Sequence, residues 1–199
     1  MHRVLGRARN QRWAQYLADL APTLFLQELF ERPATIGALC PSSRTLAARM
    51  AAQVPLNDGL VIELGAGTGV VTHALLERGV APDNLIVLEL SPRFSHRLRK
   101  RYSQLEIITG NAADLGQLIP AGKKVSAIVS SLPLCSLPAT VTQAILSQWQ
   151  PLLANGGVAV QFTYSPRTPK WQQQLAARQI STSKVWTNLP PATVARFSF

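Results

Sequence analysis

The chain contains 199 residues, of which 47% are hydrophobic, and it carries 20 Lys and Arg against 10 Asp and Glu. This size and composition predict one globular domain with a single sizeable core, to which a further segment is attached. The sequence argues against a membrane-spanning protein, because no apolar run is long enough to cross a bilayer. It argues against a secreted protein, because the basic start "MHRVLGRARNQRW" lacks the apolar core of a signal peptide. It argues against a structural zinc site, because no Cys/His cluster occurs.

The positive charge is distributed unevenly along the chain. The last carboxylate is Asp114, and the segment from Leu115 to Phe199 contains Lys and Arg but no Asp or Glu. Such an excess predicts an anionic partner, either nucleic acid or an acidic membrane surface. Cys40 and Cys135 are far apart, and we expect both to be reduced, buried thiols of a cytoplasmic protein.

The start of the chain predicts helical structure. Apolar residues recur at helical spacing from Trp13 to Phe30, and Pro22 is expected to kink this segment or to split it into two helices. After the linker "ERPATIGALCP", Ser42 or Ser43 is expected to cap a helix that runs through Met50.

From residue 60 onward, expected strands alternate with expected helices. The alternation predicts an α/β fold, a doubly wound and mostly parallel sheet of seven strands. Strands are expected at 60–64, 84–90, 105–110, 125–133, 157–164, 182–189 and 192–199. Helices are expected at 70–79, 91–102, 139–157 and 171–178.

A glycine-rich loop, "LGAGTG", follows the first of these strands, where doubly wound sheets bind their ligands. Gly65 and Gly67 match the dinucleotide fingerprint G-x-G-x-x-G, but its third position is Val70 and the last glycine comes one residue earlier, at Gly69. Glu63 stands two residues before the loop, where a carboxylate would repel a pyrophosphate and attract a cation. The expected ligand is therefore S-adenosylmethionine, which carries an ammonium and a sulfonium group.

Two more polar residues stand at the ends of expected strands. Glu89 ends the second strand, where a carboxylate can accept hydrogen bonds from both ribose hydroxyls. Asn111 follows the third strand and can hydrogen-bond an adenine ring. Each feature alone would equally fit a polar residue facing water, but three strand ends in register favour a cofactor site.

With these motifs the chain resembles the class I S-adenosylmethionine-dependent methyltransferases. "VIELGAGTG" is similar to their first motif, and "LEL" and "GNAADL" are similar to the second and third. Nearly the whole chain also resembles the bacterial phospholipid N-methyltransferases, which methylate phosphatidylethanolamine. That resemblance rests on "FLQELFERPATIGALCPSSRTLAARM", "IVSSLPLCSLP", "VQFTYSP" and "SKVWTNLPPATV". Asn111 departs from the family pattern, which more often has Asp there.

The resemblance implies a division of the chain and a set of site residues. Residues 1–55 would form a basic helical lid that faces a membrane, and residues 56–199 would form a Rossmann-like methyltransferase domain. The residues that it places at the cofactor are Glu63, Gly65, Ala66, Gly67, Gly69, Glu89, Leu90, Asn111, Ala112 and Ser130.

The resemblance also implies where the methyl acceptor binds. "SSLPL", Ser130 to Leu134, occupies the slot after the fourth strand where the transferred methyl meets its acceptor. A lipid amine must lose a proton before it attacks, and the enzyme mainly positions the two reactants. Ser131, Tyr164 and Tyr16 are the candidate catalytic residues, as hydrogen-bonding groups or proton acceptors, although Tyr164 fits a core aromatic equally well. No metal is expected.

Two alternatives remain open at this point. An rRNA adenine dimethylase would share the fold and the basic charge, but its N-L-P-Y frame reads Ser-Leu-Pro-Leu here and lacks the amide and the stacking ring. A binding module that has lost its chemistry would keep the cofactor site only. The favoured prediction is a peripheral enzyme at the inner face of the cytoplasmic membrane, which methylates phosphatidylethanolamine, its partly methylated forms or another amino lipid at an anionic membrane surface.

Overall fold

The computed structural model describes residues 43–199 except 121, 154–155, 166, 176 and 189. The expected helical segment from Trp13 to Phe30, with Tyr16, and the thiol of Cys40 lie outside the described residues. The boundary expected at residue 55 therefore stays a prediction.

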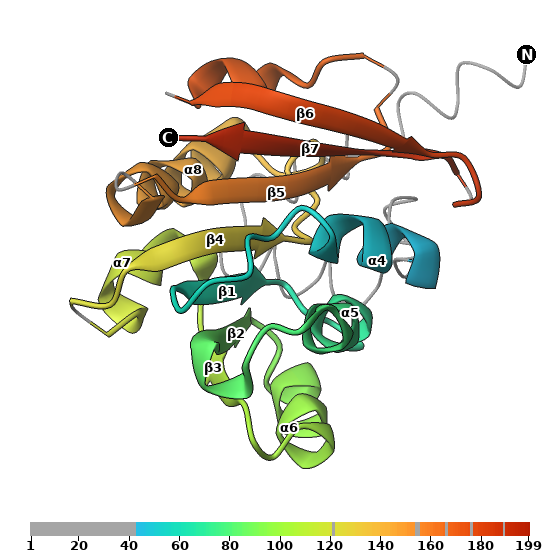
Figure 1. Ribbon diagram of the computed structural model, residues 1–199. Coiled ribbons are helices and arrows are strands. Elements are labelled where there is room, and N and C mark those ends of the chain that lie inside the picture. Colours follow the sequence, from blue (N-terminus) through green and yellow to red (C-terminus); the bar gives the residue numbers. More distant parts are fainter. Residues whose placement is uncertain (1–42, 121, 154–155, 166, 176, 189) are drawn as a thin grey trace, which may run out of the picture.

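A seven-stranded sheet forms the centre of the molecule, in the order β3-β2-β1-β4-β5-β7-β6 (Figure 1). All neighbouring strands are parallel except β7, which runs antiparallel to both β5 and β6. This arrangement confirms the doubly wound, mostly parallel α/β fold. The strands are β1 Leu60–Leu64, β2 Leu85–Glu89, β3 Glu106–Thr109, β4 Val125–Ser130, β5 Val158–Thr163, β6 Arg178–Val185 and β7 Ala192–Ser198.

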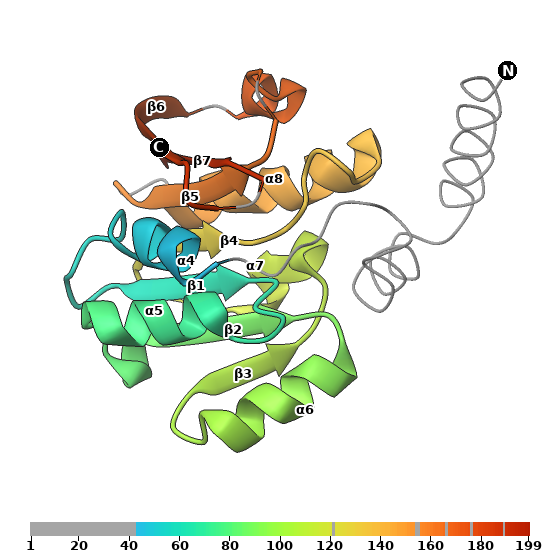
Figure 2. The same cartoon turned by 90° about the vertical axis from the view of Figure 1, so that its right-hand side faces the viewer.

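Helices cover both faces of this sheet, as Figures 1 and 2 show. One face carries α4 Arg44–Ala51, α5 Val70–Arg78 and α6 Pro92–Arg101, and the other carries α7 Leu115–Leu118 and α8 Ala139–Leu153. Short 3₁₀ helices lie at η1 Pro82–Asn84, η2 Ala112–Asp114 and η3 Lys170–Gln174.

The helix boundaries follow from local hydrogen bonding. The Ser43 hydroxyl accepts from the Leu46 N–H at 3.1 Å, which identifies Ser43 as the cap of α4. Ser91 caps α6 in the same way, with Pro92 in its first turn, a position where a missing N–H costs nothing. Gly79 ends α5 at φ 101°, a left-handed conformation that favours glycine.

Each face of the sheet has its own apolar core. On the α4 face, Leu46 and Met50 are fully buried, so α4 packs as part of the same core as the sheet. On the α8 face, the indole of Trp149 is fully buried, and Trp171 of η3 packs edge-to-face on Phe197 of β7 with ring centroids 5.8 Å apart.

Several expectations for the chain from β4 onward are wrong. The helix expected at 171–178 is the short 3₁₀ helix η3, and β6 begins at Arg178 instead of residue 182. This edge strand is almost wholly exposed, so its residues lack the alternation of apolar and polar side chains that identifies a half-buried strand. β4 ends at Ser130 and not at Pro133, because the chain turns where the Leu134 N–H donates to the Leu132 carbonyl. The Cys135 side chain is exposed, not buried.

Within the described ranges, no helix combines the length and the apolar character that a bilayer crossing requires.

Candidate active site

The glycine loop connects β1 to α5 in a left-handed backbone conformation. Gly65, Gly67 and Gly69 have φ angles of 73°, 55° and 81°, which residues with a Cβ rarely adopt. A Cβ at Gly69 would lie 2.8 Å from Leu98 Cδ2 and 3.1 Å from Tyr102 Cε2, both on the α6 side. A Cβ at Gly67 would meet nothing within 4 Å. Gly69 therefore allows close packing on α6, whereas Gly67 leaves open space on the side where a ligand can approach.

Glu89 fixes the position of this loop relative to β2. One carboxylate oxygen accepts from the Gly67 N–H at 2.8 Å, and the other accepts from the Ser91 N–H at 2.9 Å. The side chain is fully buried, and burial raises its pKa above the ordinary value, while the hydrogen bonds from Ser91 and Gly67 oppose that rise. The expected ribose-binding carboxylate therefore also serves as a support of the glycine loop.

Glu63 lies under the same loop and points toward α5. Its Oε2 accepts from the Thr72 hydroxyl at 2.6 Å, and its Oε1 has no hydrogen-bond partner among the described residues. Burial raises the pKa of Glu63 to about 8, and the hydrogen bond from Thr72 only partly offsets this effect. The sequence suggested a carboxylate anion, but in the protein alone the neutral form is favoured at pH 7.

The ends of β2 and β3 bring further predicted residues to this edge. The Asn111 carbonyl oxygen accepts from the Ala113 N–H at 3.0 Å and so caps η2, which leaves its amide NH₂ available for a ligand. Ala66 and Ala112 are buried beside the loop ends, and Leu90 is half-buried against the α8-side core.

The segment after β4 begins directly beside the glycine loop. The Ser131 N–H donates to the Leu64 carbonyl at 2.9 Å, and Leu64 immediately precedes the first loop glycine. Ser130 is fully buried and accepts from the Leu132 N–H at 3.3 Å, while the Ser131 hydroxyl is buried without a partner among the described residues. The predicted cofactor loop and the predicted acceptor segment thus meet at one edge of the sheet.

Gln161 is a residue of this region that the sequence analysis missed. Its Nε2 donates to the carbonyls of Leu132 at 2.9 Å and Phe162 at 2.8 Å, so the amide oxygen must face the other way. That oxygen is buried and has no partner within the described part of the chain. A lone polar residue inside the apolar strand "VAVQFT" was the signal that could have revealed it.

The two candidate tyrosines have different outcomes. Tyr164 directly follows β5, is half-buried, and packs edge-to-face on Phe162 with ring centroids 5.2 Å apart. It therefore lies at the same edge of the sheet as Ser131. Tyr16 lies outside the described residues. Within the described ranges, no group of three or more His, Cys, Asp and Glu side chains could hold a metal ion.

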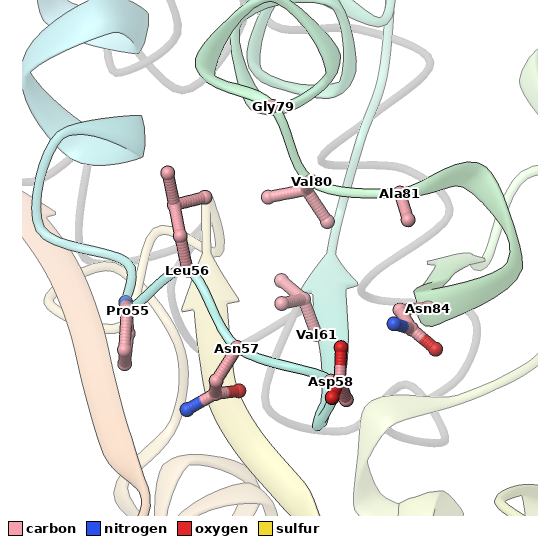
Figure 3. Close-up of a pocket in the computed structure, with 9 residues that line it drawn as sticks. All are labelled: Pro55, Leu56, Asn57, Asp58, Val61, Gly79, Val80, Ala81 and Asn84. Atoms are coloured by element: carbon pink, nitrogen blue, oxygen red, sulfur yellow. The ribbon is translucent and has the colours of Figure 1, made fainter.

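A hollow of about 220 Å³ lies at the opposite edge of the sheet (Figure 3). The loops before β1 and β2 line it, with Leu56, Val61 and Val80 forming its apolar wall and Asp58 and Asn84 among its polar residues. Because it opens at the amino ends of the strands, this hollow is separate from the glycine loop.

Comparison with known proteins identifies the family. A family model described as a methyltransferase domain matches residues 61–157. The ornithine lipid N-methyltransferase of Singulisphaera acidiphila is 32% identical over 180 residues, and the match covers 85% of this chain and 91% of that protein. The chain belongs to the S-adenosylmethionine-dependent methyltransferases. The methyltransferase is an N-methyltransferase, and S-adenosylmethionine is its cofactor.

Two further similarities are narrower. The ribosomal RNA small subunit methyltransferase A of Cupriavidus pinatubonensis is 38% identical over 82 residues. The match covers 40% of this chain and 28% of the ribosomal RNA methyltransferase. The crystal structure of the N-methyltransferase NodS from Bradyrhizobium japonicum WM9 with S-adenosyl-L-homocysteine has a TM-score of 0.62 at 18% identity, covering 78% of this chain and 84% of NodS. The latter shows that the two proteins share a fold.

The residues at the glycine loop fit S-adenosylmethionine. The buried Oε1 of Glu63, which lacks a partner among the described residues, can accept from an ammonium group, and a nearby positive charge would lower its raised pKa. The open space in front of Gly67 allows a ligand to approach the backbone closely. An anionic pyrophosphate would also fit the open space, but it would gain nothing from Glu63, so the carboxyl group is what favours a cationic ligand.

Proposed function

We propose that the methyltransferase transfers methyl groups to the amine of a membrane amino lipid. Phosphatidylethanolamine with its partly methylated forms, and ornithine lipids, are the acceptors that we expect. The similarity that covers 91% of an ornithine lipid N-methyltransferase is the observation that carries this proposal. It extends over 85% of the chain and so well beyond the cofactor motifs.

The glycine loop and the adjoining strand ends would hold the cofactor. Glu63 would accept from a cationic group, Glu89 from ribose hydroxyls, and the Asn111 amide would donate to an adenine ring. Gly65, Gly67 and Gly69, with Ala66, Leu90, Ala112 and Ser130 around them, would shape the cleft. When bound, S-adenosylmethionine supplies an electrophilic methyl group.

The acceptor amine would bind between the segment after β4 and the end of β5. The Ser131 hydroxyl and the Gln161 amide oxygen are buried acceptors without partners among the described residues, and both can accept from an amine N–H. The Tyr164 hydroxyl would accept a hydrogen bond and orient the amine while water takes its proton, or Tyr164 as a phenolate would take the proton itself, so that the neutral amine attacks. These groups would position the acceptor and exclude water, which is the main task in a direct displacement.

Contacts in this segment disfavour an adenine base as the acceptor. The Leu132 carbonyl corresponds to the one that accepts from the base amine in the N-L-P-Y frame, and here it accepts from Gln161 Nε2 and from the Leu134 N–H, each at 2.9 Å. A carbonyl oxygen has two lone pairs, so this one is saturated. Leu134 replaces the stacking aromatic ring, and its side chain is buried in the core.

The residues at the edge where β1, β4, β5 and β6 end favour a reaction at a membrane surface. Trp186 is 70% exposed and directly follows β6, which ends at the same edge as β1, β4 and β5. Lys184 lies beside it, with its ammonium 5.1 Å from the ring centroid. Tryptophan with a neighbouring cation is typical of headgroup layers. We therefore propose peripheral association with the inner face of the cytoplasmic membrane.

Mass spectrometry of total lipids would test the function directly. Bacterial cells that express the chain should accumulate an amino lipid heavier by one, two or three methyl groups, and cells that express Gly67→Asp should not, since the added side chain occupies the cofactor cleft. If lipids stay unchanged while purified rRNA gains methylated adenine, the proposed acceptor class is wrong.

A further inference from the structure

A polar pocket of about 290 Å³ lies beside the candidate acceptor site, and we name it the β5–β6 pocket. Its lining includes Thr163 at the end of β5, Thr193 near the start of β7, and Lys184 near the end of β6. Arg167, from the segment after β5, also contributes to its wall. Two cations and several hydroxyl groups therefore surround one hollow, and no carboxylate lines it in the part of the chain that the structure describes.

The strand register explains why these side chains converge. Thr163 pairs with Thr193, and Thr193 pairs with Lys184, so the three residues form one row across β5, β7 and β6. Side chains that are directly opposite one another on neighbouring strands project from the same face of the sheet. Tyr164 follows Thr163 and projects from the other face of the sheet. The pocket instead adjoins the acceptor site through the Thr163 hydroxyl, which lies 3.5 Å from the thiol of Cys135 in the segment after β4.

The segment after β5 is held in place by its own hydroxyl groups. The Ser165 N–H donates to the Thr163 hydroxyl at 3.0 Å, and the Arg167 N–H donates to the Ser165 hydroxyl at 3.3 Å. The Ser165 hydroxyl in turn donates to the Arg167 carbonyl at 2.9 Å. These local turns fix the backbone of Arg167 at the pocket wall, so a ligand would need to order only its exposed side chain and not the loop.

The positive charges around the pocket have no Asp or Glu in the same segment of the chain to balance them. Every residue that lines the pocket belongs to the segment after Asp114, which contains no Asp or Glu. Arginine and lysine in such a setting lack an acidic partner within their own segment, and phosphate or carboxylate oxygens would supply one through charge-assisted hydrogen bonds.

We propose that the β5–β6 pocket binds the anionic group of the lipid headgroup while the amine of the same lipid reaches the Ser131 and Tyr164 site. This inference rests on the proposed function. The phosphate of phosphatidylethanolamine and the carboxylate of an ornithine lipid both lie a few bonds from the amine, so either suits the arrangement. Arg167 and Lys184 would select zwitterionic lipids over simple amines.

The test compares the wild-type protein with the double variant Arg167→Gln/Lys184→Gln. Lys170→Gln is the matched control, because Lys170 is an exposed cation of η3 that does not line the pocket. Methyl transfer is measured in neutral detergent micelles with two acceptors: the amino lipid, and a long-chain primary alkylamine that carries no anionic group. Calorimetry gives the cofactor Kd of each protein, and the ³¹P line width of inorganic phosphate reports direct anion binding.

We expect the double variant to raise the KM for the amino lipid by about tenfold or more, the loss that charge-assisted hydrogen bonds imply. Its cofactor Kd and its KM for the alkylamine should match those of the wild type. The phosphate line should broaden with the wild type and with Lys170→Gln, but not with the double variant.

An unchanged KM for the amino lipid would overturn the inference. If phosphate binding is lost in the double variant while that KM stays the same, the pocket binds free phosphate and not the headgroup. If the wild-type protein binds the cofactor and phosphate but methylates no amino lipid, the proposed function fails, and only an anion-binding pocket remains.

Discussion

Glu63 shows how much the surroundings of a single carboxyl group matter. From its place two residues before the glycine loop, Glu63 was expected to carry a fixed negative charge. Its complete burial instead favours the protonated form and raises the pKa to about 8, although the hydrogen bond from Thr72 opposes that rise. A bound cation would reverse that preference, so the negative charge would develop only when the ligand is present.

The buried Glu63 should make stability depend on pH. Its folded-state pKa lies near 8 and its ordinary value is 4.5, so between these pH values the folded protein holds a proton that the unfolded chain releases. The free energy of unfolding should therefore fall as pH rises from about 5 to 8, by an amount on the order of a few kcal/mol. Burial raises the pKa of Glu89 as well, so the fall has more than one contributor.

Glu63→Gln should flatten this fall in the ligand-free protein, which denaturant titrations at a series of pH values would measure. The exposed Glu106 on β3 provides the control, and Glu106→Gln should keep the wild-type slope. Equal slopes for Glu63→Gln and the wild type would show that Glu63 is already ionised in the folded state.

Tyr164→Phe should lower kcat for methyl transfer by about tenfold or more, since positioned acid–base groups contribute at least that much. The substitution keeps the ring that packs on Phe162, so the fold and the cofactor Kd should change little. Single-turnover kinetics together with calorimetry would separate the two quantities. An unchanged rate would remove Tyr164 from the mechanism.

At the scale of elements, the packing of the glycine loop against α6 depends on Gly69. Gly69→Ala would place a methyl group 2.8 Å from Leu98 Cδ2 in a left-handed conformation, and we expect a loss of about 2–4 kcal/mol in unfolding free energy. Gly122 has the same φ of 81° with nothing within 4 Å of a Cβ, so Gly122→Ala measures the backbone strain alone. Denaturant unfolding that gives equal losses for both variants would contradict the packing argument.

Elements whose sequence reflects their burial could be predicted. The apolar runs of β1, β2, β4 and β5 predicted the sheet, and the glycines between β1 and α5 predicted the edge at which a ligand is expected. A strand was expected at 182–189, but its true start at Arg178 could not be predicted, because the exposed side chains of β6 carry no burial pattern and its neighbours in space stabilise it.

Some residues of the candidate site could be predicted from the sequence and others could not. Glu63, Glu89 and Asn111 were proposed as site residues because each lies at or near the end of a strand beside the glycine loop. Gln161 and the saturated Leu132 carbonyl were missed, because their roles depend on contacts between β5 and the segment after β4 that no local pattern records.

At the scale of the whole molecule, the excess of positive charge combines with one strongly exposed aromatic residue. Trp186→Ala should weaken partitioning onto vesicles that contain anionic lipid by roughly tenfold, since burying a large apolar side chain is worth about 1.5–3 kcal/mol. Leu56, 51% exposed at the opposite edge of the sheet, provides the control, and Leu56→Ala should bind like the wild type. Vesicle co-sedimentation at several salt concentrations would measure both variants, and equal binding would place the contact surface elsewhere.

The reversed direction of β7 has a consequence for how the enzyme would sit on a bilayer. Because β7 runs back between β5 and β6, the turn after β6 lies at the same edge as the glycine loop and Tyr164. If that edge meets the lipid, the sheet stands upright, with most strands along the bilayer normal. A lipid would then need only to lift its headgroup a short way out of the leaflet, and its acyl chains could stay among their neighbours throughout the reaction.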